Sequence, residues 1–488
     1  MTFFGNLGKG LRPLPRLLAI GALSLPLAAC DLDEILAVRD PAQVTPPELD
    51  NAQSVPFLVS GAIRQFYGGY SGFGDDAYLI TSATITDEMY NGDSFLTRIA
   101  GDLRQMQPPL LGNFTDAAYG RLHTARVLAN RAAVNADRFL EGDEADETVA
   151  LMKAIEGYSY VTLAEGWCGS LPFSEVPAEG PLDPNTLAPG TPISTMAALD
   201  EAIARFDAAI ARAGADTEGG ALARVGKARA LLDKGGTANY AAAAAAVAGL
   251  DGYSFSIEHS SNEGTQNNPV YSLVGNGRYG VSEDEGGLQR HDLCAPASLD
   301  PPSLISSPTC ADSAGWGTDE GEGMPFRSAM DPRVPWAYAG GAFSGSIRLF
   351  WPLEHTSYDD DVYLVDPAEV QLIRAETQLA AGNAAWLTTL NNLRAAAGLD
   401  ALTDPGTNAD RVRMIFQERA FWLYLTGHRQ GDLRRMVRNY GFTQAQVWPT
   451  GTNLIRATPY GQDVAFPLPF NEENNPNYDP AACNTTQA

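Results

Sequence analysis

The stretch DPAEVQLIRAETQLAAGNAAWLTTLNNLRAAAGL, residues 366–399, contains two consecutive amphipathic helical patterns. Asp366 is followed by Pro367 and, three residues on, by Glu369, which is typical of a capped helix start with a first-turn proline. Apolar residues then recur at helical spacing on both sides of a break at residues 381–383. They are Leu372, Ala375 and Leu379 before the break, and Trp386, Leu390, Leu393 and Ala397 after it. The stretch predicts a helix–turn–helix pair.

The same pattern occurs earlier in the chain. Long amphipathic segments cover residues 115–141 and 143–167, and a third covers residues 193–213. A further pair spans residues 222–232 and 240–250, where the run Ala241–Ala246 has no bulky side chain to keep a neighbouring helix away. Helix pairs with small-residue faces are typical of tetratricopeptide-like repeats of about 34 residues.

A region of different composition separates these pairs. Residues 251–365 are rich in Gly, Ser, Pro and aromatic residues and show no sustained helical period. We therefore predict an all-α protein, built as a tetratricopeptide-like helical-repeat scaffold that carries a large, irregular, loop-rich insertion. Residues 45–250 form its N-terminal helical part, residues 251–365 the insertion, and residues 366–488 the C-terminal helical part and closing segment. Long irregular insertions of this kind often bind ligands.

The N-terminus predicts export and lipidation. Three basic residues precede the apolar run 17–29, which is too short to span a membrane and ends in small residues. Cys30 follows directly, as in a bacterial lipobox. Residues 1–29 are thus expected to be a lipoprotein signal peptide, Cys30 the lipidated residue, and residues 30–44 a tether.

Four further cysteines remain in an oxidising compartment. Cys294 and Cys310 enclose a loop rich in Pro and Ser, and we expect a disulfide between them. Cys168 and Cys483 are then left, and the sequence does not decide whether they pair.

Composition and motifs limit the chemistry. A net charge of −26 over 488 residues repels phosphate groups, which argues against nucleic acid as a partner. The five histidines form no zinc motif, and the G-x-G-x-x-G match at residues 275–280 is not followed by a helical pattern. The acidic run at residues 357–366 lacks calcium-loop spacing. We therefore expect no cofactor, no metal and no catalytic residue, while a carboxylate pair for glycan hydrolysis stays open as an alternative.

Four features together resemble one family. They are the lipobox at Cys30, AIEGYSYVTLAEGWCGSLPFSEV (residues 154–176), VQLIRAETQLAAGN (residues 370–383) with its partner helix, and MIFQERAFWLYLTGHRQGDLRRM (residues 414–436) followed by FPLPFNEENNPN (residues 466–477). In this order they resemble the SusD/RagB family of outer-membrane nutrient-binding lipoproteins. The sequence departs from the family at Trp422 and Thr426, where Glu is usual.

The resemblance implies a lipid-anchored protein at the cell surface that binds nutrient oligomers and delivers them to a SusC-like TonB-dependent outer-membrane transporter. Glycans are the expected cargo; peptides, as for a RagB-like component, are the alternative, and a protein-only helical scaffold is a weaker one. Sugar rings stack on aromatic side chains. The candidate ligand contacts are Trp316, Trp336, Tyr338, Trp351, Tyr279, Tyr70 and Phe73.

The charges in residues 414–436 surround an apolar block, and we predict a structural role for them. Ions in a buried helix must be paired or hydrogen-bonded. Five residues are expected to bond one another and neighbouring helix ends, holding the terminal helices against the pair that begins at Asp366. They are Glu418, Arg419, Arg429, Asp432 and Arg435.

Overall fold

The computed structural model describes residues 50–72, 76–106, 114–174, 177, 188–282, 284–285, 288–289, 305–306, 324–453 and 455–488. Several predictions lie outside the described residues: the signal peptide, Cys30, the tether, Phe73, Trp316 and the Cys294–Cys310 pair. Residues 46–488 form one compact unit. None of the helices in the described ranges has the length and apolar character needed to cross a membrane.

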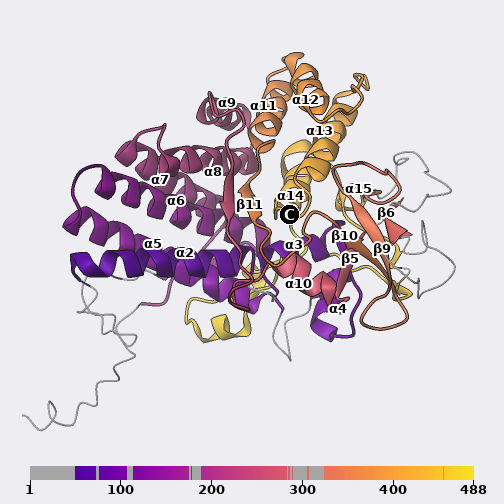
Figure 1. The fold of residues 1–488 in the computed structure, drawn as a ribbon, viewed down its shortest axis with the longest axis horizontal. Coiled ribbons are helices and arrows are strands. Elements are labelled where there is room, and N and C mark those ends of the chain that lie inside the picture. Colours follow the sequence, from indigo (N-terminus) through magenta and orange to yellow (C-terminus); the bar gives the residue numbers. More distant parts are fainter. Residues whose placement is uncertain are drawn as a thin grey trace, which may run out of the picture. The chain divides into compact units, whose positions relative to one another are not determined.

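Helices dominate the described residues, which confirms the all-α prediction (Figure 1). The N-terminal part contains α2 (Val55–Tyr70), α3 (Tyr78–Ile85), α4 (Leu96–Asp102), α5 (Asp116–Phe139), α6 (Gly142–Gly166), α7 (Thr195–Ala213), α8 (Glu218–Lys234) and α9 (Thr237–Ala246). The remainder contains α10 (Pro269–Gly275), α11 (Glu369–Ala380), α12 (Ala385–Ala396), α13 (Asn408–Trp422), α14 (Arg429–Tyr440) and α15 (Gln444–Val447). Short 3-10 helices η2 (Ala52–Ser54), η3 (Phe470–Asn474) and η4 (Pro480–Ala482) accompany them.

Local chemistry sets where these helices begin. The Asp366 carboxylate accepts a hydrogen bond from the Ala368 N–H at 2.7 Å, directly before α11, as the opening stretch predicts. The first long helix, α2, begins at Val55 and has Pro56 in its first turn. A proline inside the helix would remove a hydrogen bond and clash with the preceding turn, so Pro56 marks the start.

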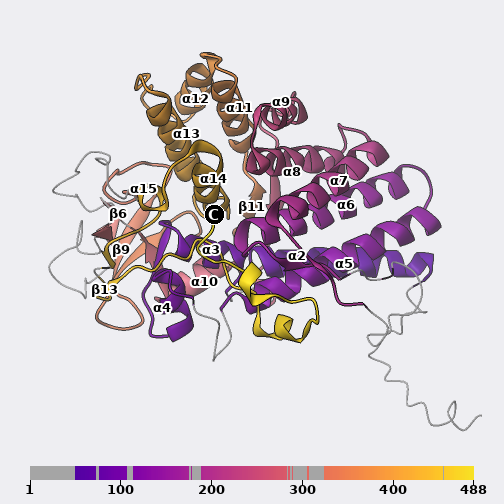
Figure 2. The same cartoon turned by 180° about the vertical axis from the view of Figure 1, so that it is seen from behind.

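The N-terminal helices pack as antiparallel neighbours along the chain. α2 contacts α5, α5 contacts α6, α6 contacts α7, and α7 contacts α8, and Figures 1 and 2 show these helices in layers. Small residues permit the close approach. A Cβ at Gly157 of α6 or at Gly226 of α8 would lie 2.6 or 2.5 Å from the ring of Phe206 on α7. These two glycines therefore let Phe206 fill the space between α6 and α8.

The insertion contains short antiparallel strands that the sequence pattern did not reveal. The strands of the described residues are β1 (Met89–Asn91), β2 (Leu171–Pro172), β3 (Pro192–Ile193), β4 (Phe255–Ile257), β5 (Tyr279–Val281), β6 (Asp284–Glu285), β7 (Leu288–Gln289), β8 (Ile305–Ser306), β9 (Trp336–Gly341), β10 (Arg348–Pro352), β11 (Val362–Val365), β12 (Thr452–Asn453) and β13 (Thr458–Pro459). β5 pairs with β1, and β4 pairs with β11. The two ends of the insertion thus pair with each other through β4 and β11, and β5, inside the insertion, joins it to a strand of the N-terminal part.

Buried ion pairs join the C-terminal helices. Asp432 of α14 accepts hydrogen bonds from Arg419 of α13 at 2.7 and 2.9 Å and from Arg435 at 2.9 Å. Arg435 also lies 3.0 Å from each carboxylate oxygen of Glu376 on α11 and 3.0 Å from Asp233 on α8. Because all five side chains are buried, each charge depends on these partners for stabilisation. The network ties α14 to α13, α11 and α8.

Glu418 forms a second buried cluster. Its carboxylate accepts from Arg333 of the insertion at 2.7 Å and from Arg394 of α12 at 2.6 Å. The indole N–H of Trp422 donates to the same carboxylate at 3.2 Å. Trp422 stands where the resembling family usually has Glu, and here it supplies a neutral donor beside Glu418 instead of a second negative charge. Glu418 therefore links α13 to α12 and to the insertion.

The turn between α13 and α14 is fixed by α3–β1 residues. Arg429 donates to both oxygens of Asp87, at 2.7 and 2.6 Å. Glu88 accepts from the Leu425 N–H at 3.0 Å, and the hydroxyl of Tyr424 donates to the Glu88 carbonyl at 3.0 Å. Leu425 has a φ of +53°, a conformation that costs free energy for a branched side chain and is held here by these bonds.

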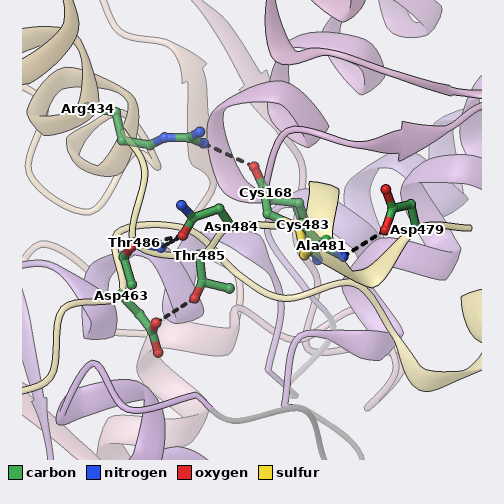
Figure 3. Close-up of a disulfide and its surroundings, with 10 residues drawn as sticks. Cys168, Arg434, Asp463, Asp479, Ala481, Cys483, Asn484, Thr485 and Thr486 are labelled. Carbon is green, nitrogen blue, oxygen red and sulfur yellow. Dashed lines mark hydrogen bonds between the residues drawn. A yellow bond between two sulfur atoms is a disulfide. The ribbon is translucent and has the colours of Figure 1, made fainter.

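A disulfide joins Cys168, at the end of α6, to Cys483 near the C-terminus, with their Cα atoms 5.1 Å apart (Figure 3). The sequence left this pairing undecided. The linked residues are 315 positions apart, so the bond ties the closing segment to the N-terminal helices.

Candidate ligand-binding site

The β9–β10 hairpin separates its aromatic side chains by strand parity. Side chains alternate between the two faces of a strand. Trp336 and Tyr338 of β9 lie on one face, where their rings sit 5.7 and 5.6 Å from the ring of Phe350 on β10. All three are buried. Trp351, the next residue on β10, points to the opposite face and is only partly buried.

That opposite face borders a shallow cavity of about 280 Å³. Its wall includes Ala339, Gly341 and Leu349 of the hairpin, Phe343 in the hairpin loop, and Trp351. The α10–β5 turn supplies the floor, with Gly275, Asn276 and Gly277. The cavity thus combines an aromatic ring with exposed backbone.

The hairpin loop and the α10–β5 turn touch at backbone distance. The Phe343 N–H donates to the Gly277 carbonyl at 2.8 Å. Gly277 has a φ of +69°, and a Cβ there would lie 2.8 Å from the Phe343 nitrogen. Only glycine fits this position without displacing the loop. The contact fixes Phe343 at the cavity rim, where 54% of its surface is exposed.

Further aromatic rings extend from the cavity. The ring of Tyr271 lies 6.1 Å from that of Trp351, and the ring of Tyr358 lies edge-on to Tyr271 at 4.9 Å. Tyr358 is 41% exposed. We refer to Trp351, Tyr271, Tyr358 and Phe343 as the aromatic ledge. Such rings can stack against the C–H faces of sugar rings.

A cation borders the ledge. The Arg278 guanidinium lies 4.6 Å from the ring centre of Phe343 and 5.2 Å from that of Phe95, so it is placed between two exposed aromatic rings. It also donates to Asp93 at 3.0 Å, and Arg98 donates to the same carboxylate at 2.7 Å. Burial opposes ionisation of Asp93, but the Phe95 N–H bond and the two arginines outweigh it and lower the pKa of Asp93. The rigid ion pairs hold Arg278 in position.

The structure separates the predicted ligand contacts. Trp351 lies at the cavity, on the aromatic ledge. Trp336 and Tyr338 face the core instead. Tyr279 is also buried, and its hydroxyl donates to Asp76 at 2.8 Å. Tyr70 is buried as well, and its hydroxyl donates to the Thr426 carbonyl at 2.7 Å. Their burial corrects the expectation of exposed contacts, because an aromatic-rich insertion must also anchor itself on the helices. Tyr271, Tyr358 and Phe343 were not among the named candidates.

Two other places have one feature each of a functional site. A cavity of about 480 Å³ lies between α13, α14 and α15, but among the described residues Phe416, which is buried, is its only aromatic lining residue. Ser71 and His259 form a serine–histidine pair with a 2.7 Å hydrogen bond, and His259 contacts the Gln266 carbonyl at 3.0 Å. A substrate could not reach this pair, because Ser71 is fully buried. The pair therefore packs α2 against the insertion.

The acidic run before α11 is occupied by backbone donors. The Asp360 carboxylate accepts hydrogen bonds from the backbone N–H groups of Thr356 and Ser357. The Asp359 carboxylate accepts one from the Ser261 N–H, and the Asp361 carboxylate accepts one from the His259 N–H. Among the described residues no group of three or more potential metal ligands occurs. In this part of the chain the carboxylates cap turns.

Comparison with known proteins bears on the resemblance. The SusD family model matches residues 359–478. The resemblance to the SusD family is confirmed. No curated protein matches this SusD-like chain in sequence.

Solved structures share the SusD-like fold over most of the chain. Surface glycan-binding protein A from Bacteroides uniformis has a TM-score of 0.60 at 15% identity, covering 88% of this chain and 99% of its own. A SusD-like carbohydrate binding protein from Bacteroides vulgatus has a TM-score of 0.59 at 13% identity, covering 87% and 96%. A laminarin binding SusD-like protein has a TM-score of 0.52 at 17% identity, covering 81% and 94%.

Proposed function

We propose that this chain is a cell-surface lipoprotein that binds oligosaccharides on the aromatic ledge and delivers them to a SusC-like TonB-dependent transporter. The observation that carries the proposal is the ledge itself: partly exposed rings beside a glycine-floored cavity in a SusD-like fold. The solved structures with this fold include proteins described as glycan-, carbohydrate- and laminarin-binding, which supports a glycan over a peptide.

The side chains of the ledge suit non-covalent binding of a sugar chain. Trp351 and Phe343 offer apolar faces for stacking, and the exposed amide of Asn276 is placed to bond a hydroxyl at the rim. The cavity is shallow, so several units of an extended chain would contact the ledge while the rest stays in water. Each stacked ring contributes a modest free energy, and affinity comes from several contacts together.

Anchoring and transport complete the proposal. A diacylated and N-acylated Cys30 would hold the protein on the membrane, since two or more acyl chains give stable attachment. Mass measurement of the protein from its native membranes tests this point. Acyl groups on Cys30 are expected, and a free thiol there would contradict the anchor.

The binding function is tested by retention on immobilised substrates. Purified protein is passed over insoluble glycans, including laminarin, and over immobilised peptides, and the eluate is analysed for released sugars. Retention on a glycan without product supports the proposal. Retention on peptides alone would favour the RagB-like alternative, and release of monosaccharides would favour a hydrolase.

A further inference from the structure

Arg278, the cation beside the aromatic ledge, keeps hydrogen-bond donors that its neighbour Arg98 has used. The nitrogens of Arg98 are all bonded, Nε and Nη2 to Asp76 at 2.8 and 2.7 Å and Nη1 to Asp93 at 2.7 Å. Arg278 donates through Nη1 to Asp93 at 3.0 Å. Within the described residues its Nε and Nη2 have no partner, and 22% of the side chain is exposed, so both nitrogens are open to solvent.

The open edge of Arg278 is the edge through which other arginines of this protein bind carboxylates. Arg419 donates through Nε and Nη2 to the two oxygens of Asp432. Arg429 uses the same two nitrogens for Asp87. The planar guanidinium fork matches two oxygens of one anionic group, which makes such contacts strong and specific. Arg278 therefore offers a two-point anion-binding edge at the surface.

The counterion of Arg278 lies beneath this surface. The Asp93 side chain is 0% exposed, and it also accepts from Arg98 and from the Phe95 N–H at 2.8 Å. In the described part of the chain, no acidic side chain lines the adjoining cavity. Exposed charges more than about 8 Å away are largely screened at physiological salt, so the net charge of −26 acts weakly here. A ligand on the ledge thus meets a cation.

Backbone contacts hold Arg278 in place. The Gly92 N–H donates to the Arg278 carbonyl at 2.7 Å, and the Ser344 N–H donates to the Gly92 carbonyl at 3.1 Å. A Cβ at Gly92 would lie 2.7 Å from the Cβ of Ala342, so glycine permits this close approach of the hairpin loop. Because the arginine is positioned before ligand arrives, little further ordering opposes binding.

Two exposed rings flank the same guanidinium. Phe343 and Phe95 are 54% and 53% exposed, and their ring centres lie 4.6 and 5.2 Å from it. Phe343 also lines the cavity that contains Trp351. Apolar faces for sugar rings and a donor edge for an anionic substituent therefore occur side by side. An acidic sugar has both of the groups that this arrangement binds.

We propose that the glycans bound on the ledge are acidic, and that the Nε–Nη2 edge of Arg278 binds their carboxylate or sulfate groups. The anionic group would take up donors that otherwise face water, while Trp351 and Phe343 stack on the sugar rings. This inference rests on the proposed glycan binding and adds the chemical class of the glycan.

Calorimetric titration with matched pairs of oligosaccharides tests the proposal. One pair is oligogalacturonate and its methyl ester, and the other is a carrageenan oligosaccharide and its chemically desulfated form. We expect about tenfold tighter binding of the charged member in at least one pair, and a preference that falls as salt is added. The pair that shows the preference distinguishes carboxylate from sulfate.

The outcomes separate this inference from the proposed function. Retention of a neutral glycan such as laminarin, with no preference for the charged member of either pair, would leave the proposed function intact and overturn the inference. Binding of no glycan at all would overturn both.

Variants assign the preference to Arg278. R278Q removes the charge and should bring the ratio of affinities for the charged and neutral members to about one. Arg98 still pairs with Asp93 in this variant, so the buried carboxylate keeps a partner. R411Q is the matched control, since Arg411 pairs with Asp404 on the surface, and it should keep the wild-type ratio.

R278K keeps a charge beside Asp93 but has no two-point edge, so it should retain only part of the preference. It also keeps the test open if R278Q does not fold. A wild-type affinity ratio in folded R278Q, or in R278K where R278Q does not fold, would overturn the assignment.

Discussion

Arg419 and Asp432, 13 residues apart, face each other across the α13–α14 turn and form a two-point ion pair at 2.7 and 2.9 Å. Both side chains are buried, and Asp432 is further bonded by Arg435. Burial opposes ionisation of Asp432, but its two arginines outweigh this and hold its pKa well below the usual range. The Arg419–Asp432 pair thus joins α13 to α14.

Replacing Arg419 with Ala should strongly destabilise the protein. The change leaves the Asp432 carboxylate buried with one arginine fewer, and breaking a buried ion pair from one side costs ~3–5 kcal/mol. Thermal unfolding measures the loss as a large fall in Tm. R411A removes an arginine from an exposed pair and should leave Tm nearly unchanged. Equal Tm values for R419A and wild type would contradict the structural role.

Replacing Trp336 with Ala should affect stability and spare specific binding. Trp336 is 3% exposed and packs against Phe350, so truncation leaves a cavity in the core that costs about 3–5 kcal/mol. Chemical denaturation measures the loss in the free energy of unfolding. Glycan affinity, measured at denaturant concentrations well below the unfolding midpoint, should equal that of wild type. A stable W336A protein with abolished glycan binding would show that this residue contacts ligand after all.

Removing the Cys168–Cys483 disulfide should lower stability and loosen the closing segment. A cross-link over 315 residues constrains the unfolded chain, and native disulfides contribute roughly 2–5 kcal/mol. C168S/C483S should therefore unfold at a lower temperature than wild type, and reductant should lower the Tm of wild type more than that of the variant, which keeps only the expected Cys294–Cys310 bond. If reductant had no effect on the wild-type Tm, the bond would not be formed in solution.

The stability of the protein should fall as pH rises between about 4.5 and 8 through Glu88. Burial raises the pKa of Glu88 from 4.5 to about 8, although the Leu425 N–H and Arg429 act against the rise. In this range the unfolded chain loses the proton while the folded chain keeps it. One such group lowers the free energy of unfolding by up to ~1.4 kcal/mol per pH unit. Below pH 4.5 its contribution is complete.

E88Q keeps an acceptor for the Leu425 N–H and cannot ionise. The difference in Tm between E88Q and wild type should therefore shift in favour of the variant as pH rises from 5 to 8. Glu354 is a second buried carboxyl group with a raised pKa and no side-chain partner in the described part of the chain. The Glu88 charge is one cause of that raised pKa, so E88Q also relieves Glu354, and this moves the difference in the same direction. A pH-independent difference would contradict the assignment to Glu88.

The helices could be predicted from the sequence, because helix caps and the spacing of apolar residues act within a few residues of each other. The start of α11 at Asp366–Glu369 is an example. The strands of the insertion could not be predicted in this way. β5 pairs with β1 almost 190 residues away, and three-residue strands such as Tyr279–Val281 are too short to show an alternating pattern.

The candidate site was only partly predictable for the same reason. Composition indicates that the insertion has many aromatic residues, but exposure depends on strand parity. Trp351 reaches the ledge, whereas Trp336, opposite Pro352 in the hairpin, faces the core. Phe343 gave no signal in the sequence, because its exposure depends on the backbone contact with Gly277.

The aromatic ledge carries the proposed glycan binding. Calorimetric titration of an oligosaccharide that the wild-type protein retains should give at least tenfold weaker binding for W351A, because the ring that stacks on the sugar is lost. F57A is the control, since Phe57 is 75% exposed on α2 and outside the ledge, and its affinity should equal that of wild type. Folded W351A that binds glycan as tightly as wild type would contradict the central claim.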